Sequence, residues 1–206
     1  MSFQGWPDEA LEFYEGLEAD NSRAYWQAHK AIYEASVLRP MQELLSDLEP
    51  YYGETKIFRP YRDVRFSHDK SLYKTAIMAI IGPGYVRFSA DGLAAGSGRH
   101  EMAGEQLTKY REAVGADAAG SALEELIADL RKQDIEVQGT APLKTAPRGY
   151  AADHPRIELL RFKGLYAWKE WPVEPWLGTA AVRQVIAGFL TATGPLSDWL
   201  AKHVGP

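Results

Sequence analysis

Residues 73–92 read YKTAIMAIIGPGYVRFSADG, and this stretch decides the fold class. Up to Ile81 the residues are apolar at both alternating sets of positions, which is typical of a buried central strand. Gly82-Pro83-Gly84 predicts a turn, residues 85–89 predict a second strand, and Ala90-Asp91-Gly92 predicts a hairpin that leads into a short return strand. The middle of the chain is therefore expected to form a mostly antiparallel sheet.

Helical patterns precede this sheet. A first helix is expected after Pro7, and a second is expected to begin near Asn21-Ser22, because both residues are good helix caps. Pro40 is expected to break or kink the second helix, and Pro50 is expected to end that section. The sequence thus predicts helices at the N-terminal side of the sheet.

Helical patterns also follow the sheet. Ser121 and Glu124 form the pattern of a capping box at the start of one helix. The other elements expected here are a helix over 105–114, a loop-like stretch over 138–155, a short helix over 157–160, an extended stretch over 165–171, a helix capped by Thr179 and a last helix starting at Gly194-Pro195. Helices, then strands, then helices without βαβ alternation predict an α+β fold, with the C-terminal helices packed on the central sheet. The length suits a single domain over 1–206.

Composition excludes several classes of protein. The chain has 206 residues and no cysteine, which excludes disulfides, a thiolate nucleophile and cysteine-bound zinc. Its start lacks the basic and apolar regions of a secretory signal, and its longest apolar run is far shorter than the ~20 residues of a membrane helix. We therefore expect a cytoplasmic protein without a membrane partner. The net charge of −5 argues against general nucleic-acid binding.

A basic segment over 59–74 interrupts this acidic chain. Its charged residues are Arg59, Arg62, Arg65, Lys70 and Lys74 against Asp63 and Asp69, so the segment carries +3 and the rest of the chain −8. Arginine offers a planar fork for phosphate or carboxylate, and lysine a mobile point charge. The cluster predicts an anion site around a turn. The alternative is an internal ion-pair network that ties the sheet to acidic helices.

A second segment, 143–155, has a related chemistry. It reads LKTAPRGYAADHP, and loops with polar and basic residues between proline and glycine often carry function. Lys144, Arg148, Tyr150 and His154 are candidates to close over the same anion. The alternative is an ordinary ordered loop in which His154-Pro155 starts a helix.

These segments resemble a known family. The resemblance rests on residues 62–75 (RDVRFSHDKSLYKT), on 84–98 and on 143–155, and it extends to the N-terminal helices around Asn21-Ser22-Arg23 and Trp26. The chain is similar to a large group of bacterial and fungal proteins catalogued as domain of unknown function 2461. Leu72 stands where that family usually has proline, and His68 where it usually has lysine. The resemblance implies that the segments belong to one family-wide pattern, and it implies no activity, substrate or cofactor.

Other catalytic chemistries lack a matching pattern. The five histidines show neither His-x-His nor His-Glu-x-x-His spacing, so no metal site is predicted. Gly96-Ser97-Gly98 lacks the full nucleophile elbow, and neither a phosphate-binding loop nor a dinucleotide fingerprint is present. The aromatic stretch around Trp168 and Trp171 fits a core strand better than a stacking surface.

The leading hypothesis is a site for an anionic, phosphate-bearing small molecule. The residues expected to neutralise it are Arg62, Arg65, Lys70, Lys74, Lys144 and Arg148. Tyr73 or Tyr150 is expected to orient the ligand, and Asp63, Asp69 or His154 are the nearby candidates for proton transfer. The pattern leaves open hydrolysis, group transfer and binding alone, and it does not give the oligomeric state. The alternatives are a protein- or nucleic-acid-interaction module and a structural ion-pair core.

Overall fold

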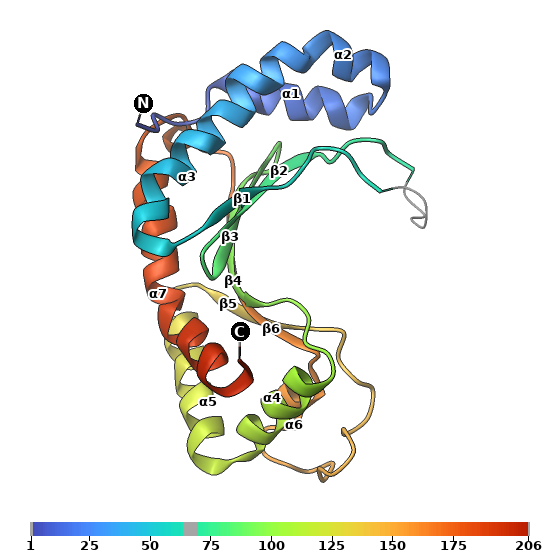
Figure 1. Ribbon diagram of the computed structural model, residues 1–206, viewed down its shortest axis with the longest axis vertical. Helices are drawn as coiled ribbons and strands as arrows, with labels where there is room; N and C mark the ends of the chain where they lie inside the picture. Colours follow the sequence, from blue (N-terminus) through green and yellow to red (C-terminus); the bar gives the residue numbers. More distant parts are fainter. Residues whose placement is uncertain (1, 64–69, 206) are drawn as a thin grey trace. The chain divides into compact units, whose positions relative to one another are not determined.

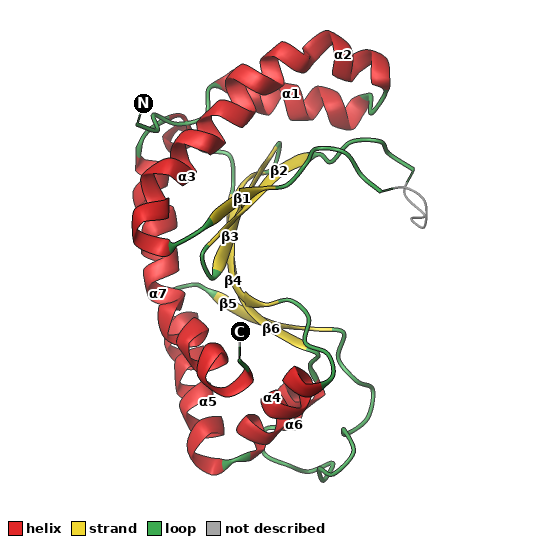
Figure 2. Ribbon diagram, viewed as in Figure 1, coloured by secondary structure: helices red, strands yellow, loops and turns green. Residues whose placement is uncertain are grey.

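The computed structural model describes residues 2–63 and 70–205 (Figures 1 and 2). The predicted site residues Arg65 and Asp69, and also His68, lie outside the described residues. The chain divides into two compact units. Unit 1 contains Met1–Ala95 and Glu170–Phe189, and unit 2 contains Gly96–Lys169 and Leu190–Pro206.

The order of elements confirms the α+β class. The helices are α1 (Asp8–Ala19), α2 (Arg23–Ile32), the π-helical turn η1 (Tyr33–Leu38), α3 (Arg39–Tyr52), α4 (Glu105–Gly115), α5 (Asp117–Lys132), α6 (Ile157–Arg161), the 3-10 turn η2 (Pro175–Gly178) and α7 (Ala181–Val204). The strands are β1 (Thr55–Ile57), β2 (Ala76–Ile81), β3 (Gly84–Ser89), β4 (Gly92–Arg99), β5 (Glu136–Thr140) and β6 (Gly164–Trp171). Their order in the sheet is β1-β2-β3-β4-β6-β5, and β1–β2, β2–β3 and β5–β6 pair antiparallel.

In unit 1, the expected cap of the second helix is confirmed, but the two prolines act differently. The Ser22 hydroxyl accepts the backbone N–H of Tyr25 at 3.1 Å, which starts α2. The helix then passes through η1 into α3, and Pro40, the second residue of α3, follows directly after the π-helical turn. Pro50 lies inside α3, which continues to Tyr52. The helix is thus not broken at Pro40, and a kink there stays a prediction. The section ends at Tyr52, two residues after the predicted end at Pro50.

The core of unit 1 forms between the N-terminal helices and the strands. Figure 1 shows α1, α2 and α3 on one face of β1–β3, and α3 packs on β1 and β2. Trp6 lies in this core with 2% of its surface exposed, and its ring stacks on Phe88 with centroids 4.4 Å apart. The aromatic residues that make the sequence rich in rings thus mainly fill a core.

Strand β2 is buried on one face only. Ile77, Ala79 and Ile81 point into the core, whereas Ile80 is 37% exposed. The expectation of a strand buried on both faces is wrong, because the side chains of the alternate set are not fully covered. The predicted turn after β2 is confirmed at Gly82, whose φ of +51° favours glycine; a Cβ there would lie 1.8 Å from the Tyr52 carbonyl oxygen.

Unit 2 departs from the sequence prediction at a helix start and at a strand. Helix α5 begins at Asp117, so Ser121 and Glu124 lie inside it and form no capping box. Strand β5 occupies Glu136–Thr140, partly within the stretch expected to be loop-like. This strand is half-buried along most of its length. Its residues have a low strand propensity, and its extended conformation depends on pairing with β6.

Helix α7 runs without interruption from Ala181 to Val204, so the prediction of a separate last helix starting at Gly194-Pro195 is wrong. Interior proline costs a helix about 3 kcal/mol. Leu190, Leu196 and Leu200 are buried on both sides of Pro195, and this packing offsets the cost.

Candidate functional site

The basic segment of unit 1 forms a two-stranded ribbon. We call residues 58–63 and 70–75 the basic ribbon; it continues the direction of β1 and β2, as Figure 1 shows. Tyr61 lies opposite Tyr73 in an antiparallel bridge. Two backbone hydrogen bonds flank this bridge, from Arg62 N–H to the Leu72 carbonyl at 3.0 Å and from Lys74 N–H to the Pro60 carbonyl at 2.8 Å. The ribbon therefore brings cations from both of its strands together.

The side chain of Asn21 anchors the ribbon to the start of α2. Its Nδ2 donates to the Tyr73 carbonyl at 3.1 Å, and its Oδ1 accepts the Tyr73 N–H at 2.9 Å. The amide thus takes the place of a neighbouring strand for this one residue. Sequence reasoning identified Asn21 as a helix cap and as part of the family resemblance, but not as a partner of the ribbon, because nothing local signals a partner 52 positions away.

Asn21→Ala is expected to destabilise the protein by about 2 kcal/mol, since it removes two hydrogen bonds and leaves backbone groups of Tyr73 unpaired. The thermal midpoint should fall by roughly 4–8 °C in a chain of this size. Ser22→Ala is the control, because it removes the neighbouring cap and costs about 1 kcal/mol. Differential scanning calorimetry compares the two, and a smaller loss for Asn21→Ala would contradict the anchoring role.

Three cations gather on the ribbon. Burial lowers the pKa of Lys74, and the positive charges of Arg59 and Arg62 lower it further. Among the residues that the structure describes, no carboxylate lies within ion-pair distance of Arg59 or Lys74. The Lys74 amine instead lies 5.3 Å from the centre of the Phe58 ring. Of the other predicted residues, Lys70 and Asp63 are exposed and Arg62 is half-buried.

Aromatic rings lie beside these cations. Trp26 stacks on Tyr73 with centroids 4.4 Å apart and planes within 7°. Its ring also contacts Tyr33 and Tyr61, at 4.9 and 5.9 Å. The Tyr73 ring is 3% exposed and so belongs to the core, whereas Tyr61 is 48% exposed. The exposed ring on the ribbon is thus that of Tyr61, which sequence reasoning did not select, and Trp26 was noted only for the family resemblance.

The other predicted segment lies in unit 2. Lys144 and Arg148 are exposed, and Tyr150 is half-buried. Burial raises the pKa of the Tyr150 hydroxyl, and the nearby charge of Glu112 raises it further. Because the two segments belong to different units, closure of both over one anion stays a prediction.

One ring nitrogen of His154 accepts a hydrogen bond from the backbone. Its Nδ1 accepts the backbone N–H of Arg156 at 3.0 Å. The neutral imidazole therefore carries its proton on Nε2 and offers a donor there. This tautomer suits hydrogen bonding to an anion better than proton abstraction at Nε2.

Arg156 is the buried cation of unit 2, although sequence reasoning did not select it. Its side chain is 7% exposed, and its Nε donates to the Val114 carbonyl at 2.7 Å. Its other nitrogens lie 3.3 Å from Asp117 and 3.4 Å from Glu124. This residue ties the end of the loop to α4 and α5, and its charge is compensated.

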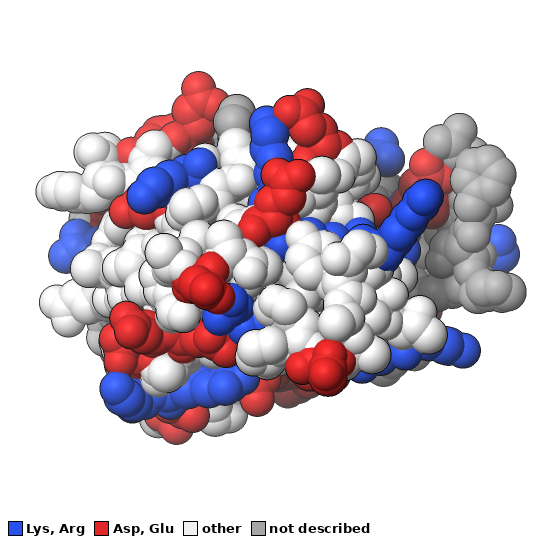
Figure 3. All heavy atoms as spheres, turned by 90° about the horizontal axis from the view of Figure 1, so that it is seen from below, with Lys and Arg blue, Asp and Glu red and all other residues white. Residues whose placement is uncertain are grey.

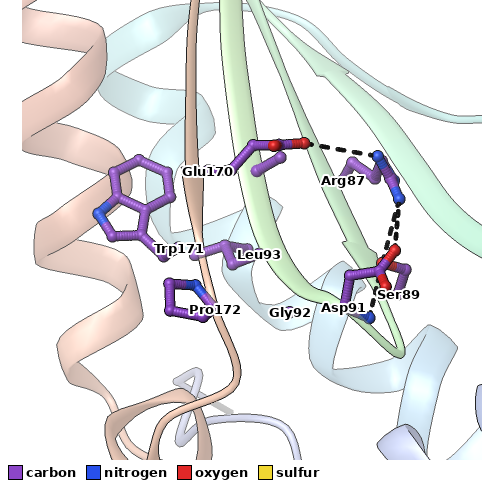
Figure 4. A pocket seen from close by; sticks show the side chains of 9 residues that line it. Arg87, Ser89, Asp91, Gly92, Leu93, Glu170, Trp171 and Pro172 are labelled. Carbon is purple, nitrogen blue, oxygen red and sulfur yellow. Dashed lines mark hydrogen bonds and ion pairs between the residues drawn. The ribbon is translucent and has the colours of Figure 1, made fainter. Parts of the chain in front are cut away.

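A pocket of about 310 Å³ lies at the β3–β4 hairpin and the end of β6 (Figure 4). Arg87 bridges two carboxylates there, with 3.2 Å to Asp91 and 3.8 Å to Glu170. Burial, together with the charge of Asp91, raises the pKa of nearby Glu18. Because carboxylates outnumber the single guanidinium, this pocket is unsuited to an anion.

Two further features bear on the class of protein. Within residues 2–63 and 70–205, no set of three or more His, Asp or Glu is placed to hold a metal ion. In the same part of the chain, no helix has the length and apolarity to cross a membrane. On the face in Figure 3, acidic and basic side chains are interspersed, without a continuous basic surface of the kind that binds nucleic acid.

Comparison with known proteins gives one match. A family model described as conserved hypothetical protein (DUF2461) matches residues 9–199. No curated protein and no solved structure matches the chain. The matched range covers nearly all elements, from α1 through most of α7, and includes both segments singled out from the sequence. The family expected from those segments is thereby confirmed: the chain belongs to the DUF2461 family.

Proposed function

We propose that the protein binds an anionic, phosphate-bearing small molecule at the basic ribbon, with Arg59, Arg62 and Lys74 as its direct partners. The observation that carries this proposal is the gathering of three cations: burial lowers the pKa of Lys74, and the positive charges of Arg59 and Arg62 lower it further. Like charges held together destabilise the free protein. An anion that relieves this repulsion gains affinity from it.

The types of side chain favour phosphate over a single carboxylate. Two guanidinium groups offer planar forks that pair with two oxygens each, and an ammonium adds a point charge. A phosphate monoester carries ~1.5 to 2 negative charges at neutral pH, which matches a cluster of several cations better than one carboxylate does. Lys70, exposed on the same ribbon, is a further candidate, as is Arg65 outside the described residues.

The test is a thermal-shift titration of the purified chain with pyrophosphate. A ligand at a hundred times its dissociation constant stabilises a protein by about 2.7 kcal/mol. That stabilisation should raise the midpoint by roughly 5–10 °C. Lys74→Gln is expected to reduce the shift strongly, because it removes a direct partner. Affinity should also fall as pH rises through the lowered pKa of Lys74, where the amine becomes neutral.

The matched control is Lys132→Gln, which removes the same charge from exposed α5 in unit 2. It should leave the shift with pyrophosphate intact. An equal shift in wild type, Lys74→Gln and Lys132→Gln would show that binding occurs elsewhere. No shift with pyrophosphate at any concentration, with Lys74→Gln merely less stable, would favour the structural ion-pair interpretation of the ribbon.

A further inference from the structure

Strand β2 carries apolar side chains on the face of the sheet that points away from α1, α2 and α3, which we call the outer face (Figure 1). Ile77 and Ala79 point into the core. Met78 and Ile80 alternate with them and lie on the outer face, where Ile80 is 37% exposed. The solvated face of an antiparallel sheet usually carries polar residues, so apolar residues at these positions need an explanation.

Phe58 extends this apolar surface onto the neighbouring strand. Its backbone N–H donates to the Met78 carbonyl at 2.9 Å, one position after the pairing of Ile57 with Ala79. Directly opposite residues of an antiparallel pair point to the same face, so the Phe58 ring lies beside Met78. We call Phe58, Met78 and Ile80 the apolar strip; the first two are half-buried. Contiguous apolar residues on a surface favour a binding role.

The cations of the basic ribbon lie at one end of the apolar strip. The two paired tyrosines of the ribbon turn their rings towards Trp26, on the core side of the sheet. By alternation, Arg62 and Lys74 project from the outer face. The Lys74 amine lies 5.3 Å from the centre of the Phe58 ring, which places both side chains on that face. Positive charge and apolar surface are thus continuous on the outer face of unit 1.

The apolar strip is short. It runs from Met78 to Ile80, about 7 Å at the usual rise per residue, which an extended chain of about six carbons spans. Lys56 is exposed and lies opposite Ile80, so a charge marks the end of the strip. Tyr85 and Arg87 of β3 border it on the other side. A short strip fits a soluble molecule, and the net charge of −5 disfavours contact with an anionic membrane surface.

We infer that the anion held at the basic ribbon is the phosphate group of a soluble monoester with a short alkyl chain, and that the chain lies on the apolar strip. This inference rests on the anion site proposed above and adds the class of its organic group. The phosphate pairs with Arg62 and Lys74, and the chain follows β2 from Phe58 to Ile80. The flexible side chain of Met78 adapts its shape to such a chain. Contact removes apolar surface of both partners from water, a gain that a bare phosphate does not have.

The first test is a calorimetric titration of the wild-type chain with pyrophosphate and with ethyl, butyl, hexyl and octyl phosphate. A fully buried methylene raises affinity about fourfold, and a half-covered one about twofold. Hexyl phosphate should therefore bind about tenfold more tightly than ethyl phosphate. Octyl phosphate should bind no more tightly than hexyl phosphate, because the strip ends beside Lys56.

The outcomes of this titration separate the inference from the proposed function. If pyrophosphate binds and ethyl and hexyl phosphate bind equally, the inference fails while anion binding stands. A rise in affinity that continues to octyl phosphate would contradict the short strip. If none of these compounds binds, the proposed function fails, and the inference fails with it.

The second test changes one end of the apolar strip. Ile80→Thr keeps a β-branched side chain in β2, and it should weaken binding of hexyl phosphate about threefold or more and leave binding of ethyl phosphate unchanged. Ile32→Thr is the matched control, because Ile32 lies in α2 and is 37% exposed, as Ile80 is. This variant should bind hexyl phosphate as the wild type does. Equal affinity of Ile80→Thr and the wild type for hexyl phosphate would overturn the inference.

Two further measurements test other occupants of the apolar strip. Sedimentation velocity should show the same oligomeric state for the wild type and Ile80→Thr; a wild-type dimer that Ile80→Thr abolishes would assign the strip to a second copy of the chain. The wild type should also stay in solution beside phosphatidylcholine vesicles that contain phosphatidic acid. Cosedimentation with these vesicles that Ile80→Thr abolishes would assign the strip to a lipid surface. Either assignment would overturn the inference.

Discussion

Trp6→Ala is expected to destabilise the protein by about 3–5 kcal/mol, the usual loss when a large buried aromatic side chain is removed. The indole stacks on Phe88 at 4.4 Å, and its Nε1 donates to the Val37 carbonyl at 3.3 Å. The backbone N–H of Trp6 also donates to the Leu177 carbonyl at 2.9 Å, so the residue joins three separate stretches of unit 1. Urea unfolding followed by circular dichroism measures the loss.

Trp6→Phe separates the contributions at this position. Phenylalanine keeps a ring against Phe88 and loses the hydrogen bond to Val37, so we expect a loss of about 1–2 kcal/mol. Similar losses for the two variants would show that the hydrogen bond, not the stacked ring, dominates. A loss below about 1 kcal/mol for Trp6→Ala would contradict the central place of Trp6 in this core.

Arg156→Met is expected to destabilise the protein by about 3 kcal/mol, because the Val114 carbonyl loses its donor inside the protein. Asp117 is fully exposed and Glu124 about half exposed, so their lost ion pairs add little. The midpoint should fall by roughly 6–12 °C, which calorimetry resolves.

Arg131→Met, on the exposed surface of α5, is the control for Arg156→Met. A surface substitution of this kind should change stability by less than about 0.5 kcal/mol. If Arg156→Met were equally mild, the buried guanidinium would be unimportant to unit 2. Methionine is chosen because it keeps much of the apolar stem of arginine.

Local signals predicted much of the fold. The turn at residues 82–84 and the cap at Ser22 depend on neighbours in sequence, and both were confirmed. Strand β5 was missed because EVQGT has a single strongly apolar residue, Val137, and a glycine that weakens strand propensity. The conformation of β5 is fixed by its pairing with β6, in which Val137 lies opposite Ala167, a residue 30 positions further along the chain.

The candidate site likewise combines features that local sequence predicts with contacts that only the folded chain creates. Charge clustering alone pointed to Arg62 and Lys74, because it can be counted along the sequence. Asn21 and Trp26 reach the ribbon from the start of α2, and their contacts with Tyr73 exist only after the helix and the ribbon have folded against each other.

Neither unit is one continuous piece of chain. Unit 1 requires Glu170–Phe189 in addition to Met1–Ala95, and unit 2 is interrupted in turn by the same stretch. On the ribosome, at ~5–20 residues per second, the first stretch of unit 1 waits roughly 5–20 s for the second. Until then, the Trp6 backbone lacks the Leu177 carbonyl that accepts its N–H. The nascent chain thus spends its synthesis with an incomplete N-terminal core, and in that period it depends most on chaperones and is most open to proteases.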